Sequence, residues 1–473
     1  MKRYLWLAWM AFLFLFCSAC GDTFRPIIIP NLPTFPDPRA VHTIIAVNNN
    51  GPTNPNEPFG PGSVLVVDVS GDSEVSIAKV GVTPVHAVQQ TASQILVVNQ
   101  ATTSSFVNSL SKIVFSGTIV NGTPGTISLP PNSAPNFVAV APSDTLAYVT
   151  LPKFVPDPVN FPTVVVPSVG VVNTQSNNLV TTIPLSNSPS FNPFALVVTP
   201  DKSKLYVACD PVDPGPCSLS AFNTLDRSAR PITGTLSSPP IWLSARSDSQ
   251  RVFVLESNGT NGTLASLDTT STAGPDTLTE SGISVPGATT MVYDGHLNRL
   301  YIPGGNAVAV VDVSQSAPLL LATVEITQAS GRGAQDPCAT TATEILNTVA
   351  AAALPDGSRA YFGTFYEDAL GNICPQVTVI NTSNNSVKAT IAVPGFPNFD
   401  GLCAKTRFRF TMAAGGDSSR TYLASCDSGG VNIIDTSTDS FLVNVPGPVS
   451  SRAPISPGQQ PPPQNPVFLI AGP

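Results

Sequence analysis

Residues 169–185 read VGVVNTQSNNLVTTIPL, and residues 377–393 read VTVINTSNNSVKATIAV. In both stretches an alternating apolar run ends in Asn-Thr, a short Asn-rich turn follows, and a second alternating run comes after it. Alternation with a period of two is typical of half-buried β-strands, and the turn between the runs indicates an antiparallel hairpin. Two copies of one hairpin far apart in the chain predict a repeated structural unit.

Further copies of the pattern occur along the whole chain. An apolar run that ends in Asp or Asn is found at four more places: 64–70, 263–269, 308–314 and 431–437. A run with an aromatic or aliphatic pair stands ahead of it in eight places, spaced 47 to 61 residues apart: 44–47, 95–98, 146–149, 204–207, 251–254, 299–302, 359–362 and 420–423. Six of the eight follow a turn that contains aspartate: Asp144, Asp201, Asp248, Asp294, Asp356 and Asp417. Aspartate at the start of a turn accepts hydrogen bonds from the backbone and favours a tight hairpin.

Each unit therefore contains four antiparallel strands, because a further apolar run lies before the Asp turn and another after the Asn-rich turn. A four-stranded sheet with two apolar faces buries both by stacking against neighbours in a closed ring. The sequence predicts an all-β fold, a single β-propeller over residues 41–473 with eight blades, and leaves seven blades as the alternative. Helical periodicity is nearly absent, and residues 343–353 fit either a helix or a strand.

The two ends of the repeat region predict how the ring closes. The first unit begins directly with its second strand, at 42–47, and lacks a first strand. The chain ends in NPVFLIAGP (465–473), an apolar run that no further unit follows. We expect this C-terminal run to pair with the N-terminal strands and complete one blade, after the Pro-rich connection 447–466.

These motifs resemble a known repeat family. A strand that ends in Tyr-Val, then V-x-V-I-D/N-T, an Asn-rich turn and V-x-x-T-I-x-V are similar to YVTN-type β-propeller repeats, best at 146–185 and 359–393. The resemblance covers most of residues 41–473 and is weakest at 95–128. Some YVTN-like propellers resemble lactonases that use polar residues around the central channel, but no motif specific enough to transfer those residues is present.

The first forty residues carry features of an exported, lipid-anchored protein. Lys2 and Arg3 precede an apolar run of about a dozen residues, shorter than the ~20 that span a bilayer, as in a secretory signal peptide. Ser18-Ala19 then precede Cys20, which resembles a bacterial lipoprotein signal, although Cys17 stands where Leu is usual. We expect residues 1–19 to be a signal peptide, Cys20 to be lipidated, and the Pro-rich residues 21–40 to be an extended tether. Plain secretion and an uncleaved anchor are the alternatives.

The expected location is therefore the bacterial cell envelope, at the outer membrane or cell surface. The composition agrees, because only 11% of the residues are charged and Ser, Thr, Asn and Gln supply the polar surface. The net charge is −8, and no run of Lys or Arg follows the first residues. Binding to nucleic acid needs clustered cations, so we exclude that class of function.

Six cysteines lie beyond the leader, and the repeat map suggests how they pair. In an exported chain an even number of cysteines favours disulfides. The loop before the first strand and the loop between the second and third strands emerge on one face of a blade. The expected pairs are therefore Cys338–Cys374 and Cys403–Cys426, which each join the two loops of one unit, and Cys209–Cys217, which flank a single loop between second and third strands. Six unpaired cysteines remain the alternative, and no Cys/His cluster suggests a metal site.

Candidate contact residues come from the charged groups of the seventh and eighth units. Arg407 and Arg409 alternate with phenylalanines on an expected first strand, so both guanidinium groups would point toward the channel mouth and favour an anionic ligand. Lys405 and four acidic residues complete this charged group. All of its members except Lys405 are candidate ligand contacts: Arg407, Arg409, Asp336, Glu367, Asp368 and Asp400. The alternative is that these side chains only solvate loops and bond neighbouring blades.

No catalytic constellation or cofactor motif is visible in the sequence. The three histidines, His42, His86 and His296, fall in separate units. Nucleophile-elbow, zinc-protease, phosphate-loop and EF-hand patterns are missing, so we expect no catalytic residue, no metal and no cofactor.

The sequence thus favours a monomeric, membrane-tethered propeller without catalytic activity. Long loops, at 48–62, 151–162, 327–342 and 365–374, share the face of the predicted disulfides. Braced loops on a rigid scaffold are common binding sites. We expect a protein or polysaccharide partner in the cell envelope; a lactonase-like or other hydrolase that uses the channel is the alternative.

Overall fold

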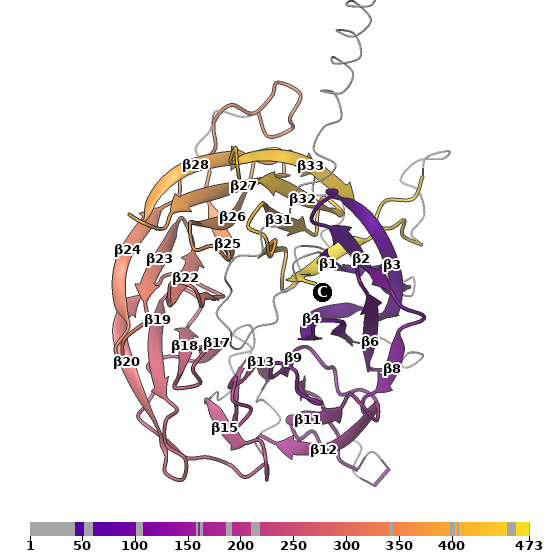
Figure 1. The fold of residues 1–473 in the computed structure, drawn as a ribbon, viewed down its shortest axis with the longest axis vertical. Coiled ribbons are helices and arrows are strands. Elements are labelled where there is room, and N and C mark those ends of the chain that lie inside the picture. The colour runs from indigo at the N-terminus through magenta and orange to yellow at the C-terminus, as the bar shows by residue number, and fades with distance from the viewer. Residues whose placement is uncertain are drawn as a thin grey trace, which may run out of the picture.

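A computed structural model describes residues 43–51, 60–100, 107–157, 159–160, 164–185, 192–209, 218–339, 344–397, 403, 406–451 and 460–472. The predicted signal peptide and tether, with Cys20, lie outside these residues, as do His42, Cys217, Asp400 and Lys405. The described residues form eight sheets that follow one another around a central axis (Figure 1). The predicted eight-bladed propeller is confirmed, and the seven-bladed alternative is wrong. No helix in the described part of the chain is long and apolar enough to cross a membrane.

The first four blades come from the N-terminal half of the chain, except for the C-terminal strand β34 in blade 1. Blade 1 contains β1 (Thr43–Asn49), β2 (Pro61–Asp68), β3 (Ser73–Val82) and β34 (Asn465–Ala471). Blade 2 contains β4 (Pro84–Thr91), β5 (Gln94–Asn99), β6 (Ser109–Ser116), β7 (Ile119–Val120) and β8 (Gly125–Ser128). Blade 3 contains β9 (Val138–Val140), β10 (Leu146–Leu151), β11 (Ser168–Asn173) and β12 (Asn178–Pro184); blade 4 contains β13 (Pro193–Val198), β14 (Lys204–Cys209) and β15 (Ser220–Asn223).

The other four blades complete the ring. Blade 5 contains β16 (Ile232–Thr233), β17 (Pro240–Ala245), β18 (Arg251–Ser257), β19 (Gly262–Asp268) and β20 (Asp276–Ser284). Blade 6 contains β21 (Val292–Asp294), β22 (Arg299–Gly304), β23 (Ala307–Asp312) and β24 (Leu319–Glu325). Blade 7 contains β25 (Asn347–Ala353), β26 (Arg359–Glu367), β27 (Asn372–Asn381), β28 (Ser386–Ala392) and β29 (Phe396–Pro397); blade 8 contains β30 (Phe410–Ala414), β31 (Arg420–Ser425), β32 (Gly430–Asp435) and β33 (Ser440–Pro446). The ambiguous segment 343–353 thus ends in a strand.

Ring closure follows the prediction. The C-terminal strand β34 pairs antiparallel with β1 and is the innermost strand of blade 1, whose other strands come from the N-terminus. In Figure 1 the yellow C-terminal strand lies beside the indigo β1. The two ends of the repeat region are therefore joined in one sheet.

Blade 4 departs from the four-strand pattern in the described residues. Its sheet contains three strands, and the segment after β15 makes only a bridge between Phe222 and Ala229. The chain then continues as β16, which pairs parallel with β20, the outermost strand of blade 5. The segment that would be the fourth strand of blade 4 is therefore shared with the next blade.

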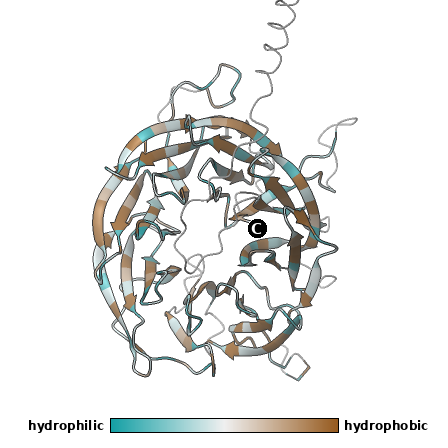
Figure 2. Ribbon diagram, viewed as in Figure 1, coloured by the Kyte–Doolittle hydropathy of each residue, from teal (hydrophilic) through white to brown (hydrophobic). Residues whose placement is uncertain are grey.

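Apolar contacts between neighbouring blades form the core. The aromatic residue of the second strand is fully buried in six blades: Tyr148, Tyr206, Phe253, Tyr301, Tyr361 and Tyr422. Each core cluster joins residues from adjacent blades, as where Tyr422 of blade 8 packs with Ile44 of blade 1. Hydrophobic residues accordingly lie along the strands, while the connecting loops are more hydrophilic (Figure 2).

The Asn-rich turn of the repeated hairpin has a defined chemistry. Asn173 and Asn381 end their strands, and each side-chain oxygen accepts a hydrogen bond from the backbone N–H two residues later. The residue four positions on, Asn177 or Asn385, has a positive φ of 55° or 54°. Asparagine tolerates this left-handed conformation better than most residues, so both ends of the turn favour asparagine. Aspartates play these roles in other blades: Asp68 with Asp72, and Asp435 with Asp439.

The threonine after Asp or Asn joins one blade to the blade before it. Its hydroxyl donates to a carbonyl in the turn between the first and second strands of its own blade. Its own carbonyl accepts a hydrogen bond from a cationic side chain of the preceding blade. The four pairs are Lys112 with Thr174, Lys204 with Thr269, Arg299 with Thr382, and Arg359 with Thr436. The recurring Asn-Thr or Asp-Thr thus contributes to four seams between blades; in blade 6 the carbonyl of Val313 accepts the same kind of bond from Arg246.

One buried carboxyl group predicts a pH dependence of stability. Glu256 on β18 is fully buried, and its Oε2 accepts hydrogen bonds from the Ser238 backbone at 2.8 Å and the Ser237 hydroxyl at 3.1 Å. Burial, and then the nearby Glu280, raise the pKa of Glu256 from 4.5 to about 7. The folded state therefore holds this proton more tightly than the unfolded state. Its contribution to stability is complete below pH 4.5 and is lost as the pH rises through about 7.

We expect Glu256→Gln to remove this decline, because an amide is neutral at every pH. The variant should melt a few degrees above the parent protein at pH 8 and close to it at pH 4. Thermal melts of both proteins between pH 4 and pH 8 measure the difference. Parallel curves for the two proteins would show that Glu256 does not titrate in this range.

Candidate functional site

The two faces of the ring carry different structures. First strands begin, and second strands end, on one face, which we call the loop face. It carries the connections between blades and the loops between second and third strands, such as 368–371 between β26 and β27. The opposite face carries the short turns that follow first strands and third strands, including the Asp turns.

Disulfides brace the loop face in blades 7 and 8. Cys338 is bonded to Cys374, and Cys403 to Cys426, which confirms two predicted pairs. Each bond joins the loop before a first strand to the end region of the second strand or the start of the third. Cys209 at the end of β14 is also disulfide-bonded, and its predicted partner Cys217 lies outside the described residues.

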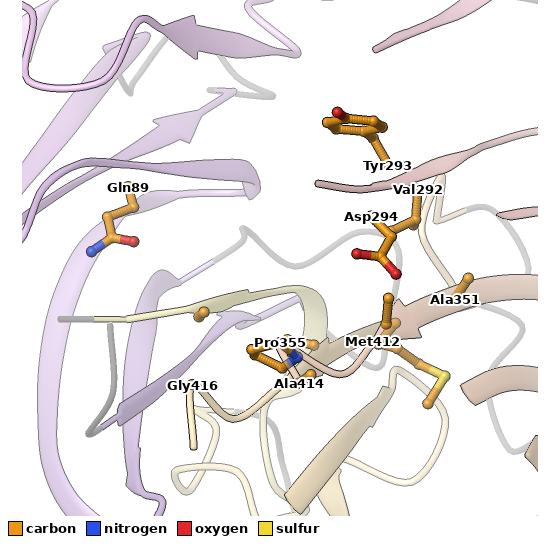
Figure 3. Close-up of a pocket in the computed structure, with 13 residues that line it drawn as sticks. Gln89, Val292, Tyr293, Asp294, Ala351, Pro355, Met412, Ala414 and Gly416 are labelled. Atoms are coloured by element: carbon orange, nitrogen blue, oxygen red, sulfur yellow. The ribbon is translucent and has the colours of Figure 1, made fainter. Parts of the chain in front are cut away.

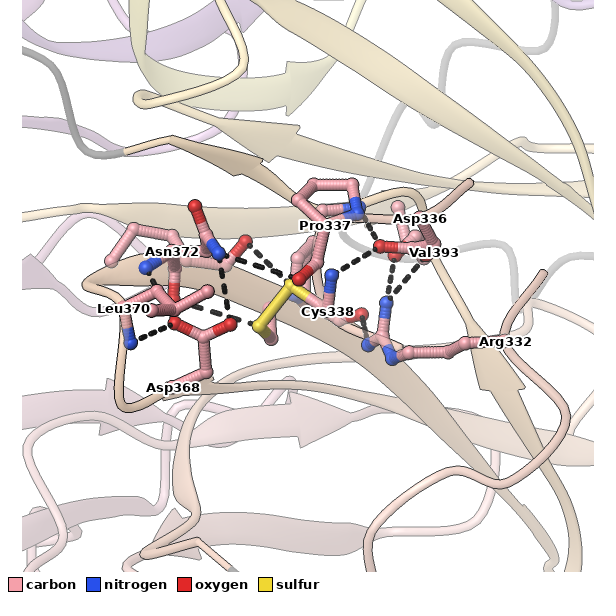
Figure 4. Close-up of a disulfide and its surroundings, with 12 residues drawn as sticks. Arg332, Asp336, Pro337, Cys338, Asp368, Leu370, Asn372 and Val393 are labelled. Atoms are coloured by element: carbon pink, nitrogen blue, oxygen red, sulfur yellow. Dashed lines mark hydrogen bonds and ion pairs between the residues drawn. A yellow bond between two sulfur atoms is a disulfide. The ribbon is translucent and has the colours of Figure 1, made fainter. Parts of the chain in front are cut away.

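Two of the predicted acidic contact residues support the loops around Cys338–Cys374 (Figure 4). Asp336 forms an ion pair with Arg332 at 3.1 Å and accepts the Cys338 N–H at 2.9 Å. Asp368 accepts N–H groups of Leu370 and Asn372 at 2.9 and 2.8 Å. Burial alone would raise the pKa of Asp368, but the hydrogen bonds from Asn372 and the backbone outweigh it and lower that pKa. Glu367, at the end of β26, is exposed.

The same disulfide rules out a metal role for the nearby group. Cys338, Asp368 and Cys374 bring their ligand-type atoms within 4.8 Å of one another. Both sulfur atoms are already bonded to each other, and a disulfide sulfur does not replace the thiolate that binds metals. This group therefore belongs to the scaffold.

The two predicted arginines lie just before β30 and face different surroundings. Arg409 forms a two-bond ion pair with Asp427, Nε to Oδ2 at 2.6 Å and Nη2 to Oδ1 at 2.8 Å. Arg407 lies over the ring of Phe194 in blade 4, with its Cζ 3.7 Å from the ring centroid. The predicted alternation on a strand is wrong at this point, because β30 begins only at Phe410. Residues 406–409 instead reach across the channel.

An aromatic cluster, which the sequence did not predict, fills one side of the channel. Six blades contribute one ring each: Phe468, His86, Phe137, Phe194, Trp242 and Phe408. Phe408 lies within 4.9 Å of Phe468 and 6.0 Å of both Phe194 and Trp242, between ring centroids. The rings of His86 and Phe137 stack at 3.8 Å. Burial lowers the pKa of His86 to about 3, so this histidine is neutral at physiological pH.

The other side of the channel is hollow. A cavity of about 840 Å³, the upper cavity, lies between the aromatic cluster and blades 6 to 8. It is lined by Trp242, Thr289, Thr290, Met291, Val292, Val349, Ala350, Ala351, Phe365, Thr406, Arg407, Phe408, Arg409, Phe410, Thr411, Met412, Phe468 and Leu469. Most of these residues stand at or near the starts of first strands, and Phe365 lies near the end of a second strand, so the upper cavity lies toward the loop face.

A smaller cavity of about 260 Å³, the lower cavity, lies toward the opposite face (Figure 3). Its lining includes Tyr293 and Asp294 at the end of β21, Pro355, and Gly416. Three residues line both cavities: Val292, Ala351 and Met412. The two cavities are therefore sections of one axial channel that these apolar side chains divide.

Comparison with known proteins supports the fold and does not identify a function. No protein-family model matches the chain, and no curated protein matches it in sequence. Apo AztD from Citrobacter koseri aligns with a TM-score of 0.55 at 11% identity, over 91% of this chain and 98% of that one. The dihydro-heme d1 dehydrogenase NirN, in complex with DHE, aligns with a TM-score of 0.55 at 10% identity, over 89% of this chain and 77% of that one. A hypothetical selenium-binding protein from Sulfolobus tokodaii aligns with a TM-score of 0.52 at 10% identity, over 76% of this chain and 93% of that one. At these identities the similarity shows a shared β-propeller fold alone.

Proposed function

We propose that the chain is a cell-envelope-anchored propeller of YVTN-type repeats that binds a protein or polysaccharide partner through its loop face. The lipidated Cys20 holds it to the membrane, and residues 21–40 form the tether. The propeller acts as a monomer and needs no cofactor. The anchor is testable, because Cys20→Ser should release the chain from the membrane fraction. Retention of that variant in the membrane fraction would argue against lipidation.

The observation that carries this proposal is the bracing of the loop face. Two described disulfides, together with the Asp336 and Asp368 hydrogen bonds, hold loops of blades 7 and 8 in one conformation. Preorganised loops lose less conformational entropy when a partner binds. Between them, Leu370 presents an apolar side chain that is 85% exposed at the tip of the β26–β27 loop. An exposed leucine on a braced loop suits contact with a macromolecular surface.

The lining of the channel favours binding over hydrolysis. Of the described residues that line the upper cavity, none is Asp, Glu, His, Cys or Ser. A hydrolase needs a general base near its nucleophile, and these are the residue types that usually supply it. Asp294 of the lower cavity accepts backbone N–H groups of the β21–β22 turn, which is a structural role.

A matched pair of leucine variants tests the proposed surface. Leu370 lies on the loop face, whereas Leu225, which is 93% exposed, follows β15 on the opposite face. Immobilised protein carrying Leu370→Ser should retain less of its partner from a cell-envelope extract, whereas Leu225→Ser should retain as much as the parent. Equal retention by the two variants would exclude this loop as the contact, and stronger loss with Leu225→Ser would place it on the opposite face.

A further inference from the structure

The centre of the ring is asymmetric, and the asymmetry leaves a ligand-sized space. Blades 1 to 5 and blade 8 each place an aromatic ring in the channel cluster. The first-strand segments of blades 6 and 7 instead line the channel with Thr290, Met291 and the run Val349–Ala351, and the one ring of blade 7 at the cavity, Phe365, comes from its second strand. Because these side chains are smaller, they do not fill the volume that a ring would occupy. The upper cavity is the space that remains.

The size and lining of the upper cavity match a small-molecule site. Its volume of about 840 Å³ falls in the usual range for ligand pockets, which are mostly apolar with a few polar groups. Trp242, Phe365, Phe408 and Phe468 line it and are only partly buried, although they lie at the centre of the ring. When a ligand covers this apolar surface and removes it from water, the free energy of the complex falls, which favours binding.

The arrangement of the rings favours a planar aromatic ligand. Phe365 and Phe410 stack on one wall with their centroids 4.8 Å apart and their planes 14° from parallel. Trp242 and Phe408 meet edge to face on the opposite wall, at 6.0 Å and 82°. Aromatic rings prefer such offset-stacked and edge-to-face neighbours, so a flat ring between the walls finds both.

The polar lining of the cavity consists of threonine hydroxyls and of charged groups of one sign, which are hydrogen-bond donors. Arg407 and Arg409 both line it, and no carboxylate does so among the described residues. A guanidinium group has five N–H donors in a fixed plane, so it can serve a ligand acceptor in addition to its protein contacts. The ligand should therefore carry an acceptor, such as a carboxylate, sulfonate or carbonyl, on its aromatic body.

We propose that the upper cavity binds a planar aromatic small molecule that bears a hydrogen-bond acceptor directed at Arg407. This site lies inside the channel and does not depend on the macromolecular partner of the loop face. The two can be tested separately, because the leucine variants above lie outside the cavity.

The test uses two fluorescent probes that share an anilinonaphthalene body. 1-Anilinonaphthalene-8-sulfonate has the acceptor, and N-phenyl-1-naphthylamine lacks it. The full chain carrying Trp6→Phe and Trp9→Phe has Trp242 as its single tryptophan. Energy transfer from Trp242 to either probe then reports binding near the cavity. Absence of transfer with both probes would overturn the proposal.

A cavity-filling variant separates this site from other apolar surfaces. Thr290→Phe with Val349→Phe gives blades 6 and 7 the rings that the other blades have, and should weaken both probes about tenfold or more without lowering the Tm. The matched control, Leu319→Ser with Leu321→Ser, changes exposed residues of the outer strand β24 and should leave both affinities unchanged. The reverse result would assign probe binding to the outer strands.

Arg407→Met tests the acceptor. It keeps an unbranched apolar stem and removes the donors, so sulfonate binding should weaken about tenfold, the worth of one charged hydrogen bond. The probe without the sulfonate should bind within about twofold of the parent protein. Equal weakening of both probes would show that Arg407 only shapes the cavity, which would overturn the acceptor part of the proposal.

Discussion

Replacement of Asp276 by Asn is expected to destabilise the protein by about 3–5 kcal/mol, the range for breaking a buried ion pair. Asp276 on β20 is completely buried and accepts hydrogen bonds from Lys204 Nζ at 2.7 Å, Tyr206 Oη at 2.7 Å and Arg230 Nη2 at 3.1 Å. Lys204 and Arg230 are themselves 5% and 7% exposed. The variant leaves two buried cations without their counter-charge, and chemical denaturation measures the loss.

The position of Asp276 explains why the effect should be large. Lys204 and Tyr206 belong to β14 of blade 4, whereas Asp276 begins β20 of blade 5. At this seam the segment after β15 leaves its own sheet and pairs with β20. Arg230 in that segment also donates to the carbonyls of Ser271 and Gly274. The buried charges therefore stabilise a junction at which blade 4 has only three strands of its own in the described residues, while the segment after β15 pairs with blade 5.

Asp268→Asn is the matched control in the same blade. Asp268 forms an ion pair with Arg251 at 3.0 Å, but the side chains are 33% and 16% exposed. The asparagine oxygen can still accept the Thr270 N–H that Asp268 accepts now. We expect a loss of at most about 1 kcal/mol, as for solvent-exposed pairs. Equal losses for the two variants would show that burial does not set the cost.

The architecture was predictable because it follows from short-range patterns repeated eight times. A strand period of two, an Asp turn and an Asn-rich turn are each visible within a few residues. Each copy of the repeat therefore predicts the same four-stranded unit independently of the others. The repeated VVNT and VINT also mark the ends of the third strands correctly, but the contacts that their threonines make between blades became visible only in the structure. Thr174 and Thr382 bond both their own blade and a cation of the preceding blade.

The channel was not predictable in the same way, since its residues come from six blades and meet only after the ring closes. One signal was present: Phe137, Phe194, Trp242, Phe408 and Phe468 each stand near the start of a first strand. The ion pair of Arg409 could not be predicted either, because its acidic residue, Asp427, lies in a turn after β31 that has no distinguishing motif. The predicted contacts Glu367 and Asp368 lie on the loop face, and Asp400 lies outside the described residues.

Removal of β34 is expected to abolish the cooperative folding of the propeller. β34 is the first strand of blade 1, and its apolar residues pack on both sides of that blade. Leu469 contacts the cluster shared with blade 8, and Val467 the cluster shared with blade 2. Phe468 also enters the aromatic cluster of the channel. Burial of each such side chain contributes about 1.5–3 kcal/mol, so the loss approaches the 5–15 kcal/mol that usually stabilises a domain.

A chain that ends at residue 464 should therefore show no cooperative thermal transition and a weak near-ultraviolet circular dichroism signal. A chain that lacks only Pro473 is the control and should melt like the parent protein. Addition of a synthetic peptide of residues 465–473 should restore the transition, because the exposed edge of β1 can accept the same strand from another molecule. A truncated chain that melts cooperatively within a few degrees of the control would show that the other seven blades hold the ring without the closing strand.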